Sequence, residues 1–327
     1  MMKIKTIKGS ELSSTEEMSI LDSALLRGFI FEYSCKSGQC GVCKATLIDG
    51  QVSELQPQLA LTDEEKKNHK ILTCCCEPIT DILIDAEDLT ALKSVEVKTL
   101  PARISHIKAL SNDIIKVQFR FPPAANFKFI EGQYLDVIWG SVRRSYSIAS
   151  MRDDQEVTLL IKKVALGVMS DYVFNHAKVN DLIRVEGPKG TFFLRNISRP
   201  LILLATGTGI APIMSILSRL DKDEELSPQH TIHLFWGNRY VEDFVWQPEF
   251  SHIKVIIEHV VSKPDDHWQG QTGYIQKVAL RVLGSKIIDS DVYACGANAM
   301  IQSAKQLFIE QGLPEKQFYS DAFVQSF

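Results

Sequence analysis

The sequence of 327 residues has no apolar run long enough to span a bilayer, no stripe of basic residues, no internal repeat and no low-complexity segment. The first absence argues against a membrane-spanning protein, and the second argues against a nucleic-acid-binding surface. Residues 2–9 alternate as a strand does and lack the apolar core of a signal peptide. We therefore expect a cytoplasmic protein of two or three domains, with neither a membrane nor a nucleic acid as its partner.

Seven cysteines are present, and four of them follow an informative spacing. A run C-x4-C-x2-C with a distant fourth cysteine is the plant-type pattern for a [2Fe–2S] cluster, and it predicts four ligands: Cys35, Cys40, Cys43 and Cys74. Thiolates are soft ligands that suit iron–sulfur centres. Gly38 and Gly41 give the loop its backbone freedom, and the loop would bring backbone N–H groups close to the sulfurs. The alternative, a set of buried structural cysteines, does not explain why spacing, glycines and distant partner agree.

The fourth ligand needs a choice, because three cysteines follow one another at positions 74–76. In plant-type ferredoxins the last ligand comes directly after a leucine and one further residue. The run Ile71–Cys74 resembles that segment and favours Cys74. Cys75 and Cys76 are then expected to be small packing residues, with a redox role for either as the alternative.

Acidic residues are concentrated in the N-terminal part of the chain. Residues 1–93 contain 10 lysine and arginine against 15 aspartate and glutamate residues, a net charge of −5. The remaining residues contain 26 against 25, a net charge of +1. This asymmetry predicts that the cluster domain docks to a basic patch on a redox partner protein, with charge steering the encounter. General solubility explains the same asymmetry equally well.

Residues 1–93 are expected to form a small α+β domain, whose resemblance to ferredoxins implies a β-grasp-like fold. After a hairpin-like start, a helix is predicted near Glu16–Arg27, capped by Ser14 or Thr15. A strand over residues 44–48 is followed by Asp49 and Gly50, which predict a hairpin turn. A second helix opens at residues 62–65 with the pattern of a capping box. Residues 94–100 are expected to be a linker.

The rest of the chain predicts two further domains. Residues 100–195 contain alternating runs such as 114–121 and 157–162, separated by turn residues, which is typical of a small antiparallel β-barrel. Residues 196–327 contain apolar runs that alternate with helical stretches, which predicts a doubly wound α/β domain. The expected parallel strands lie at 201–205, 231–236, 254–257 and 291–295.

The run from Arg143 to Ser150 in the barrel segment has the chemistry of a flavin site. A guanidinium can grip a diphosphate, an aromatic ring can lie against an isoalloxazine, and a hydroxyl can bond near its N5. The turn Gly167–Ser170 follows a strand and precedes a helix-like stretch starting at Asp171, which suits a pyrophosphate. Together these runs resemble the ferredoxin–NADP reductase family. The resemblance implies that FAD is bound by these residues: Arg144, Tyr146, Ser147, Lys162, Gly167, Met169 and Ser170.

A second glycine turn, from Leu204 to Pro212, joins an apolar strand to a helix, where a backbone can approach a pyrophosphate closely. This turn and two later strand ends resemble the nicotinamide site of the same family. The resemblance implies that NAD(P)H is bound by these residues: Gly207, Thr208, Gly209, Pro212, Asn238, Arg239, Cys295 and Gly296. It also places Cys295 near the point where the nicotinamide meets the flavin. The alternative for Cys295 is a buried cysteine at a strand end.

The tail from Phe318 to Val324 resembles the flavin-reductase branch and the reductases of deoxysugar synthesis. In this interpretation Asp321 assists charge changes near the flavin, and Ser147, Cys295 and Asp321 form the catalytic group. Phe323 is equally well explained by packing.

The family resemblance covers the whole chain and implies an NAD(P)H-dependent oxidoreductase. Two electrons would pass as a hydride from NAD(P)H to FAD, and singly through the [2Fe–2S] cluster to another protein. The expected partner is the pyridoxamine-phosphate sugar dehydrase of 3,6-dideoxyhexose synthesis, part of lipopolysaccharide assembly. One alternative is the reductase component of an aromatic-ring or alkene oxygenase, and another is a ferredoxin-like binding module with degenerate further domains. Glu242 and Asp243 favour NADH through a ribose hydroxyl, whereas Arg239 would suit the 2′-phosphate of NADPH.

Overall fold

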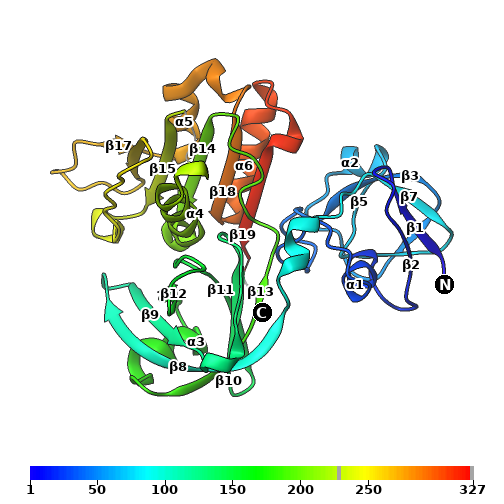
Figure 1. The fold of residues 1–327 in the computed structure, drawn as a ribbon. Coiled ribbons are helices and arrows are strands. Elements are labelled where there is room, and N and C mark those ends of the chain that lie inside the picture. The colour runs from blue at the N-terminus through cyan, green and yellow to red at the C-terminus, as the bar shows by residue number, and fades with distance from the viewer. Residues whose placement is uncertain (227–229, 325–327) are drawn as a thin grey trace. The chain divides into compact units, whose positions relative to one another are not determined.

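The computed structural model describes residues 1–226 and 230–324, and it divides into two compact units, Met1–Glu96 and Val97–Phe327 (Figure 1). The expected boundaries of three domains, at 1–93, 100–195 and 196–327, stay a prediction. None of the helices in the described part of the chain is both long enough and apolar enough to cross a membrane.

The first unit is a mixed sheet with strand order β2-β1-β7-β3-β5 and a separate pair of short strands, β4 and β6. β1 pairs antiparallel with β2 and parallel with β7, the β-grasp-like arrangement that the resemblance implied. The strands are β1 (Lys3–Thr6), β2 (Glu11–Ser13), β3 (Lys44–Asp49), β4 (Val52–Glu54), β5 (Lys70–Leu72), β6 (Cys76–Pro78) and β7 (Ile82–Ile84). The helices are α1 (Ile20–Leu26), α2 (Asp63–Lys67) and the 3-10 turn η1 (Thr90–Ser94). Ile4, Ile20 and Phe31 lie in the core between sheet and helix.

The predicted first helix is wrong at its start. α1 begins at Ile20, and its cap is Ser19, whose hydroxyl accepts a hydrogen bond from the backbone N–H of Asp22 at 3.0 Å. Ser14 instead accepts from the backbone N–H of Met2 at 2.9 Å. Glu17 has a φ of +58°, which the right-handed helix does not allow. Several residues of this stretch can cap a helix, and the chain uses the last of them.

The predicted hairpin at Asp49 and Gly50 is also wrong. β3 pairs with β5 and β7, whereas β4 pairs with β6, so the turn does not join paired strands. Gly50 has a φ of +89°, and a Cβ there would lie 2.2 Å from the backbone oxygen of Asp81. Close approach to a neighbouring strand therefore explains this glycine. The capping box of α2 is confirmed, because Thr62 and Glu65 exchange hydrogen bonds as predicted.

The second unit begins with the predicted antiparallel barrel, in strand order β11-β10-β13-β8-β9-β12. A bridge between Ile148 and Leu159 brings the two outer strands together, which closes the sheet. The strands are β8 (Lys98–Ala109), β9 (Ile114–Arg120), β10 (Tyr134–Trp139), β11 (Val142–Ser147), β12 (Val157–Lys162) and β13 (Leu182–Lys189), with the turns η2 (Pro123–Ala125), α3 (Val168–Asp171) and η3 (Tyr172–His176). The expected linker therefore ends earlier than predicted, because β8 starts at Lys98. The helix expected from Asp171 starts three residues earlier, at Val168.

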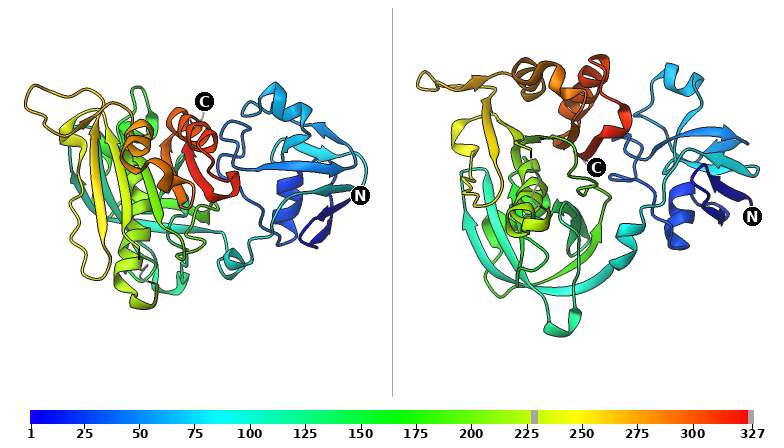
Figure 2. Two further views of the ribbon diagram at one scale, coloured as in Figure 1. Left: turned by 90° about the horizontal axis from the view of Figure 1, so that it is seen from above. Right: turned by 45° about the horizontal axis from the view of Figure 1, so that its top comes forward.

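The predicted doubly wound sheet follows, with six parallel strands in the order β17-β16-β15-β14-β18-β19 (Figure 2). These are β14 (Leu201–Thr206), β15 (Ile232–Asn238), β16 (Val255–Val261), β17 (Gln271–Thr272), β18 (Asp291–Ala297) and β19 (Phe318–Phe323). The helices are α4 (Ile210–Lys222), α5 (Ile275–Leu283) and α6 (Asn298–Glu310), with the turns η4 (Gly207–Gly209), η5 (Glu224–Leu226), η6 (Val241–Asp243), η7 (Gly284–Ile287) and η8 (Glu315–Gln317). All four predicted parallel strands are confirmed.

Helices cover both faces of this sheet. α4 packs with Leu203 and Trp236 in one apolar core. Gly237, the next residue of β15, points to the opposite face, where a Cβ would lie 2.5 Å from Ile275 of α5. The carboxyl ends of β14, β15, β18 and β19 therefore lie side by side, at the edge of a doubly wound sheet where ligands bind.

Candidate functional site

The four expected cluster ligands lie on the loop before β3 and on the turn after β5. Three of them are buried, and Cys35 is partly exposed. Their sulfurs form two pairs: Cys40 hydrogen-bonds to Cys35, and the sulfurs of Cys43 and Cys74 lie 3.2 Å apart. Two pairs of thiols are the donor set that two iron atoms need. These residues therefore fit a [2Fe–2S] cluster.

Backbone N–H groups surround these sulfurs, as expected. The N–H of Ser37 donates to the sulfur of Cys35 at 3.4 Å, and the N–H of Gly38 donates to that of Cys74. Gly38 has a φ of +72°, and a Cβ there would lie 2.3 Å from the backbone oxygen of Pro57. The close approach requires glycine at this position.

Within each pair, hydrogen bonding gives the two thiols different pKa values. The hydrogen bond from Cys40 lowers the pKa of Cys35 to about 5. The hydrogen bonds from Cys43 and Cys75 lower the pKa of Cys74 to about 3. The same hydrogen bonds raise the pKa of Cys40 and Cys43, so within each pair they favour the thiolate form, which binds metal, at Cys35 and at Cys74.

Cys75 and Cys76 are completely buried in the core of the first unit. The sulfur of Cys75 lies 3.5 Å from that of Cys74, and burial raises the pKa of Cys76 to about 12. Their burial is what packing residues require.

In the second unit, strand β11 carries two of the expected flavin residues, Arg144 and Tyr146, on one side. Arg144 and Tyr146 are both partly buried, and burial raises the pKa of Tyr146 to about 12. The guanidinium of Arg144 donates to the backbone oxygen of Arg143 at 2.7 Å. Among the residues that the structure describes, no carboxylate pairs with Arg144. Its charge is therefore available to an anionic ligand.

The other side of β11 is occupied by a buried ion cluster that sequence reasoning missed. Asp136 of β10 is 5% exposed, and its carboxylate accepts hydrogen bonds from Arg143 at 3.0 Å, Ser145 at 2.6 Å and Lys189 at 2.7 Å. Burial would raise the pKa of Asp136, but these partners together lower it. A charged residue inside the apolar strand Tyr134–Trp139 was the signal that could have revealed it.

The turn Gly167–Ser170 is tightly closed. The hydroxyl of Ser170 is buried, accepts from the backbone N–H of Val164 at 3.2 Å and donates to the oxygen of Gly167 at 2.9 Å. Met169 is 2% exposed and packs in the barrel core. The structure thus gives both side chains a part in shaping the turn, and their contact with FAD stays a prediction.

The glycine turn after β14 lies against the end of β18. A Cβ on Gly209 would lie 2.3 Å from the backbone oxygen of Cys295, and a Cβ on Gly296 would lie 2.2 Å from the hydroxyl of Thr206. That hydroxyl accepts from the backbone N–H of Ala297 at 2.9 Å. Gly207 has a φ of +56° and would point a Cβ into open space. The turn is therefore packed on one side and open on the other, which suits the approach of a phosphate.

The expected catalytic residues meet at three strand ends. The hydroxyl of Ser147 donates to the carboxylate of Asp321 at 3.4 Å, and the sulfur of Cys295 lies 4.0 Å from the same oxygen. All three side chains are buried. Burial, together with the charge of Asp321, raises the pKa of Cys295 well above its usual value. Cys295 is thus a neutral thiol.

The expected site residues at and after the end of β15 differ in burial and in their hydrogen-bond partners. Asn238 is buried and donates to the backbone oxygen of Asp243 at 3.2 Å, whereas Arg239 is exposed. Asp243 is 4% exposed and binds Lys162 at 3.3 Å and Ser111 at 3.0 Å. These barrel contacts occupy Asp243, which therefore does not offer a free carboxylate to a ribose. Pro212 is buried in the first turn of α4.

Three family models match successive parts of the chain. Residues 5–78 match the 2Fe-2S iron-sulfur cluster binding domain, residues 101–194 the oxidoreductase FAD-binding domain, and residues 203–306 the oxidoreductase NAD-binding domain. The CDP-6-deoxy-L-threo-D-glycero-4-hexulose-3-dehydrase reductase of Yersinia pestis is 38% identical over 97% of each chain. The chain belongs to the iron–sulfur flavoprotein reductases.

Other members of these reductases serve different systems. The toluate 1,2-dioxygenase electron transfer component of Pseudomonas putida is 30% identical over 94% of this chain and 93% of its own. The fold also matches the crystal structure of the Amycolatopsis cytochrome P450 reductase GcoB, with a TM-score of 0.75 and 22% identity over 99% of each chain. This reductase is therefore an oxidoreductase that uses a [2Fe–2S] cluster, FAD and NAD(P)H for electron transfer, and it is not a binding module with degenerate domains.

Proposed function

We propose that this reductase supplies electrons to the dehydrase of 3,6-dideoxyhexose synthesis, the activity known as CDP-6-deoxy-delta-3,4-glucoseen reductase. The observation that carries the proposal is the 38% identity to the Yersinia pestis dehydrase reductase over 97% of both chains. The toluate dioxygenase component, at 30% identity, has the alternative kind of partner. The proposed partner is a pyridoxamine-phosphate sugar dehydrase, and the proposed location is the cytoplasm.

The chain's own residues hold and orient the cofactors. When bound, FAD accepts a hydride from NAD(P)H and the cluster carries single electrons. Cys35, Cys40, Cys43 and Cys74 would hold the cluster as thiolates, with backbone N–H groups directed at the sulfurs. In the second unit, Arg144 would neutralise the diphosphate of FAD, and Tyr146 would lie against its ring system.

Ser147, Cys295 and Asp321 would control charge where the two ring systems meet. Asp321 accepts the hydrogen bond of Ser147, which holds that hydroxyl in one orientation. The same carboxylate and complete burial keep Cys295 protonated. A neutral thiol adds no negative charge that would oppose the arrival of a hydride. We assign Ser147 to the flavin side and Cys295 to the nicotinamide side of this group.

NADH is the proposed electron donor. Because Asp243 is bound to Lys162 and Ser111, the exposed Glu242 is the acid left to meet a ribose hydroxyl. Such a contact favours NADH over NADPH. Arg239, three residues earlier in the sequence, is also exposed and is the residue that would instead favour NADPH.

The test is anaerobic NADH oxidation coupled to a purified acceptor. One reaction contains the sugar dehydrase with CDP-4-keto-6-deoxyglucose, and a parallel reaction contains a ring-hydroxylating oxygenase with its aromatic substrate. A 3-deoxy sugar product that requires both proteins supports the proposal. Turnover with the oxygenase alone contradicts it and favours the alternative partner. NADH oxidation by ferricyanide in both samples checks that the reductase is active.

A further inference from the structure

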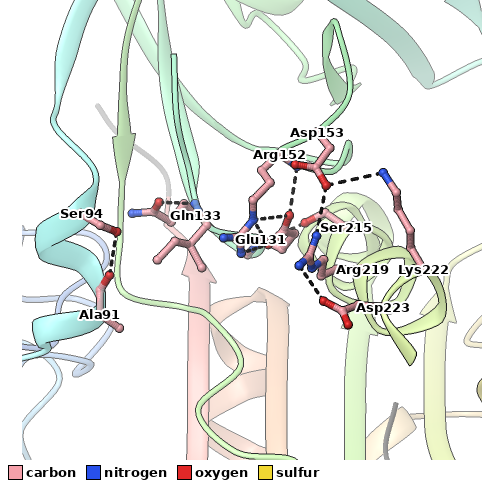
Figure 3. Close-up of polar contacts among 12 residues, drawn as sticks. Ala91, Ser94, Glu131, Gln133, Arg152, Asp153, Ser215, Arg219, Lys222 and Asp223 are labelled. Atoms are coloured by element: carbon pink, nitrogen blue, oxygen red, sulfur yellow. Dashed lines mark hydrogen bonds and ion pairs between the residues drawn. The ribbon is translucent and has the colours of Figure 1, made fainter. Parts of the chain in front are cut away.

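Helix α4 is joined to two turns of the flavin barrel by polar contacts (Figure 3). The helix starts at the turn Gly207–Gly209, to which we assign the pyridine nucleotide. One barrel turn, residues 130–133, precedes β10. The other, residues 150–154, begins three residues after the end of the flavin strand β11. The contacts therefore join the segment that holds one cofactor to the segment that holds the other.

The middle of α4 contacts the barrel turn 130–133, and the contact is to the backbone of that turn. The N–H of Gly132 donates to the hydroxyl of Ser215 at 3.2 Å, and Ser215 is completely buried. Gly132 has a φ of +103°, and a Cβ there would lie 2.3 Å from the backbone oxygen of Phe192. Removing the hydroxyl would leave a buried N–H without a partner, which is costly.

The two barrel turns are joined to each other by a buried ion pair. Glu131 is 3% exposed, and its carboxylate accepts from the backbone N–H of Arg152 at 3.0 Å and from its Nε at 3.0 Å and 2.9 Å. Burial would raise the pKa of Glu131, but the hydrogen bonds from Arg152 lower it. This pair therefore ties the turn 150–154 to the turn 130–133.

The last turns of α4 contact Asp153. Its carboxylate lies 3.1 Å from Nη1 of Arg219 and 3.5 Å from Nζ of Lys222. Nη2 of Arg219 binds Asp223 at 2.7 Å, so the guanidinium is held on both sides. Asp153 and Lys222 are exposed and Arg219 is partly exposed, and each pair is weak by itself. Together with Ser215, they attach α4 to the barrel at two places, the middle of the helix and its C-terminal end.

We propose that Arg152, Asp153, Ser215 and Arg219 are positioning residues for hydride transfer, which set where the nucleotide turn lies relative to β11. A helix of 13 residues is stiff, so a shift at its middle and end moves its first turn as well. Ser147 is only five residues before Arg152 in the sequence. A misplacement of about 1 Å between reacting groups can slow a reaction by about 100-fold. The proposal rests on the nucleotide turn assigned above and does not depend on which protein accepts the electrons.

The test exchanges the charges of Asp153 and Arg219 in the full-length holoenzyme. We would compare Asp153→Arg, Arg219→Asp and the double variant, with Ser215→Ala as a milder variant and Asp153→Asn in case a reversal fails to fold. The measurements are the rate constant of flavin reduction at saturating NADH in an anaerobic stopped-flow instrument, the Kd for NADH, the flavin content and the Tm. Lys305→Glu is the matched control, because it breaks a partly exposed pair with Glu315, 2.8 Å long, elsewhere in the same sheet domain.

We expect each reversal to lower the rate constant about tenfold, with flavin content and Kd for NADH preserved, and the double variant to regain most of the rate. Ser215→Ala should also lower the rate, and Lys305→Glu should leave it unchanged. Wild-type rates in the single variants would overturn the proposal, as would a double variant no faster than the slower single one. Gly209→Ala tests separately whether the pyridine nucleotide binds at the turn Gly207–Gly209. An unchanged Kd for NADH in this variant would overturn that assignment, and the positioning role with it.

Discussion

The cluster unit and the flavin–nicotinamide unit build their sites in opposite ways. In the first, three of four expected ligands lie within residues 35–43, on one loop shaped by glycines and backbone contacts. In the second, Ser147 and Cys295 meet Asp321 from positions 174 and 26 residues away. A loop site depends on local backbone conformation, whereas a site made of strand ends depends on how a whole sheet packs.

The two units also differ in what they bury. Within residues 1–96, all of which the structure describes, the buried polar side chains are hydroxyls, thiols and one amide. In the described part of the second unit, five carboxylates are buried: Glu131, Asp136, Asp243, Asp291 and Asp321. A buried charge needs partners from other segments. The second unit therefore places buried carboxylates beside its cofactor segments, whereas the buried groups around the cluster loop are thiols, hydroxyls and one amide.

The largest expected effect is a variant that loses the function of the first unit while the second unit stays active. Cys74→Ser should abolish electron delivery to a protein acceptor, because the cluster loses a thiolate, while NADH oxidation by ferricyanide continues through the second unit. The visible and EPR spectra and the iron content of the purified variant measure the loss. Cys76→Ser is the control, since this buried residue is expected only to pack. A normal cluster spectrum in Cys74→Ser would show that another residue is the fourth ligand.

A change in the second unit should have the converse effect, slower flavin reduction with an intact cluster. Asp321→Asn removes the charge beside Ser147 and Cys295 and should slow flavin reduction by NADH by about 10- to 100-fold, with an unaltered cluster spectrum. Stopped-flow reduction measures the rate. Asp291→Asn is the control, because Asp291 is equally buried at the other end of the neighbouring strand β18. If both variants reduce flavin at the wild-type rate, Asp321 has no part in hydride transfer.

A third prediction concerns the loop geometry of the cluster unit. Gly38→Ala and Gly9→Ala both place a side chain at positive φ, +72° and +92°, but only at position 38 would the Cβ collide, 2.3 Å from the oxygen of Pro57. We expect Gly9→Ala to cost about 1 kcal/mol and Gly38→Ala to cost clearly more and to lose the cluster faster. Cluster bleaching in denaturant compares the two. Equal bleaching rates would mean that the loop adjusts freely.

Much of the fold could be predicted, because burial patterns in strands are local. The strand expected at 157–162 is β12, and the run at 201–205 lies within β14. The errors arose where several residues compete for one local role. Ser14, Thr15 and Ser19 are all able to cap a helix, and Asp49 and Gly50 are able to turn a chain without pairing its flanks.

The candidate site was predictable only in part, for a related reason. Motifs indicated Cys35, Ser147 and Gly207, since the chemistry of each is visible in its neighbours. No motif indicated that Asp243 binds Lys162, because that contact joins residues 81 positions apart. Such contacts depend on strand order and on the packing of the barrel against the sheet domain, which a single sequence does not display.

A smaller effect is expected at Gln56 in the cluster unit. Its amide donates to the backbone oxygens of Lys36 at 3.1 Å and Cys74 at 2.9 Å, so it joins the loop of the first ligand to the segment of the last. Gln56→Leu should speed cluster loss, because two carbonyls lose a donor, at a cost of about 1–3 kcal/mol. Gln51→Leu, at an exposed position, is the control. Cluster absorbance followed in chelator distinguishes them, and identical decay would assign Gln56 no such role.

The smallest effect is a difference in acid sensitivity. The partners of Asp136 hold its pKa below the ordinary value despite burial, so its contribution to stability is complete above that ordinary value and decreases as the pH falls below about 4. All four tryptophans lie in the second unit, so their fluorescence reports its unfolding alone. Asp136→Asn should lower the Tm at pH 7 and make it fall less than the wild-type Tm on acidification. Since no carboxylate within residues 1–96 is buried, a wild-type Tm that did not fall between pH 5 and pH 3 would remove this difference between the units.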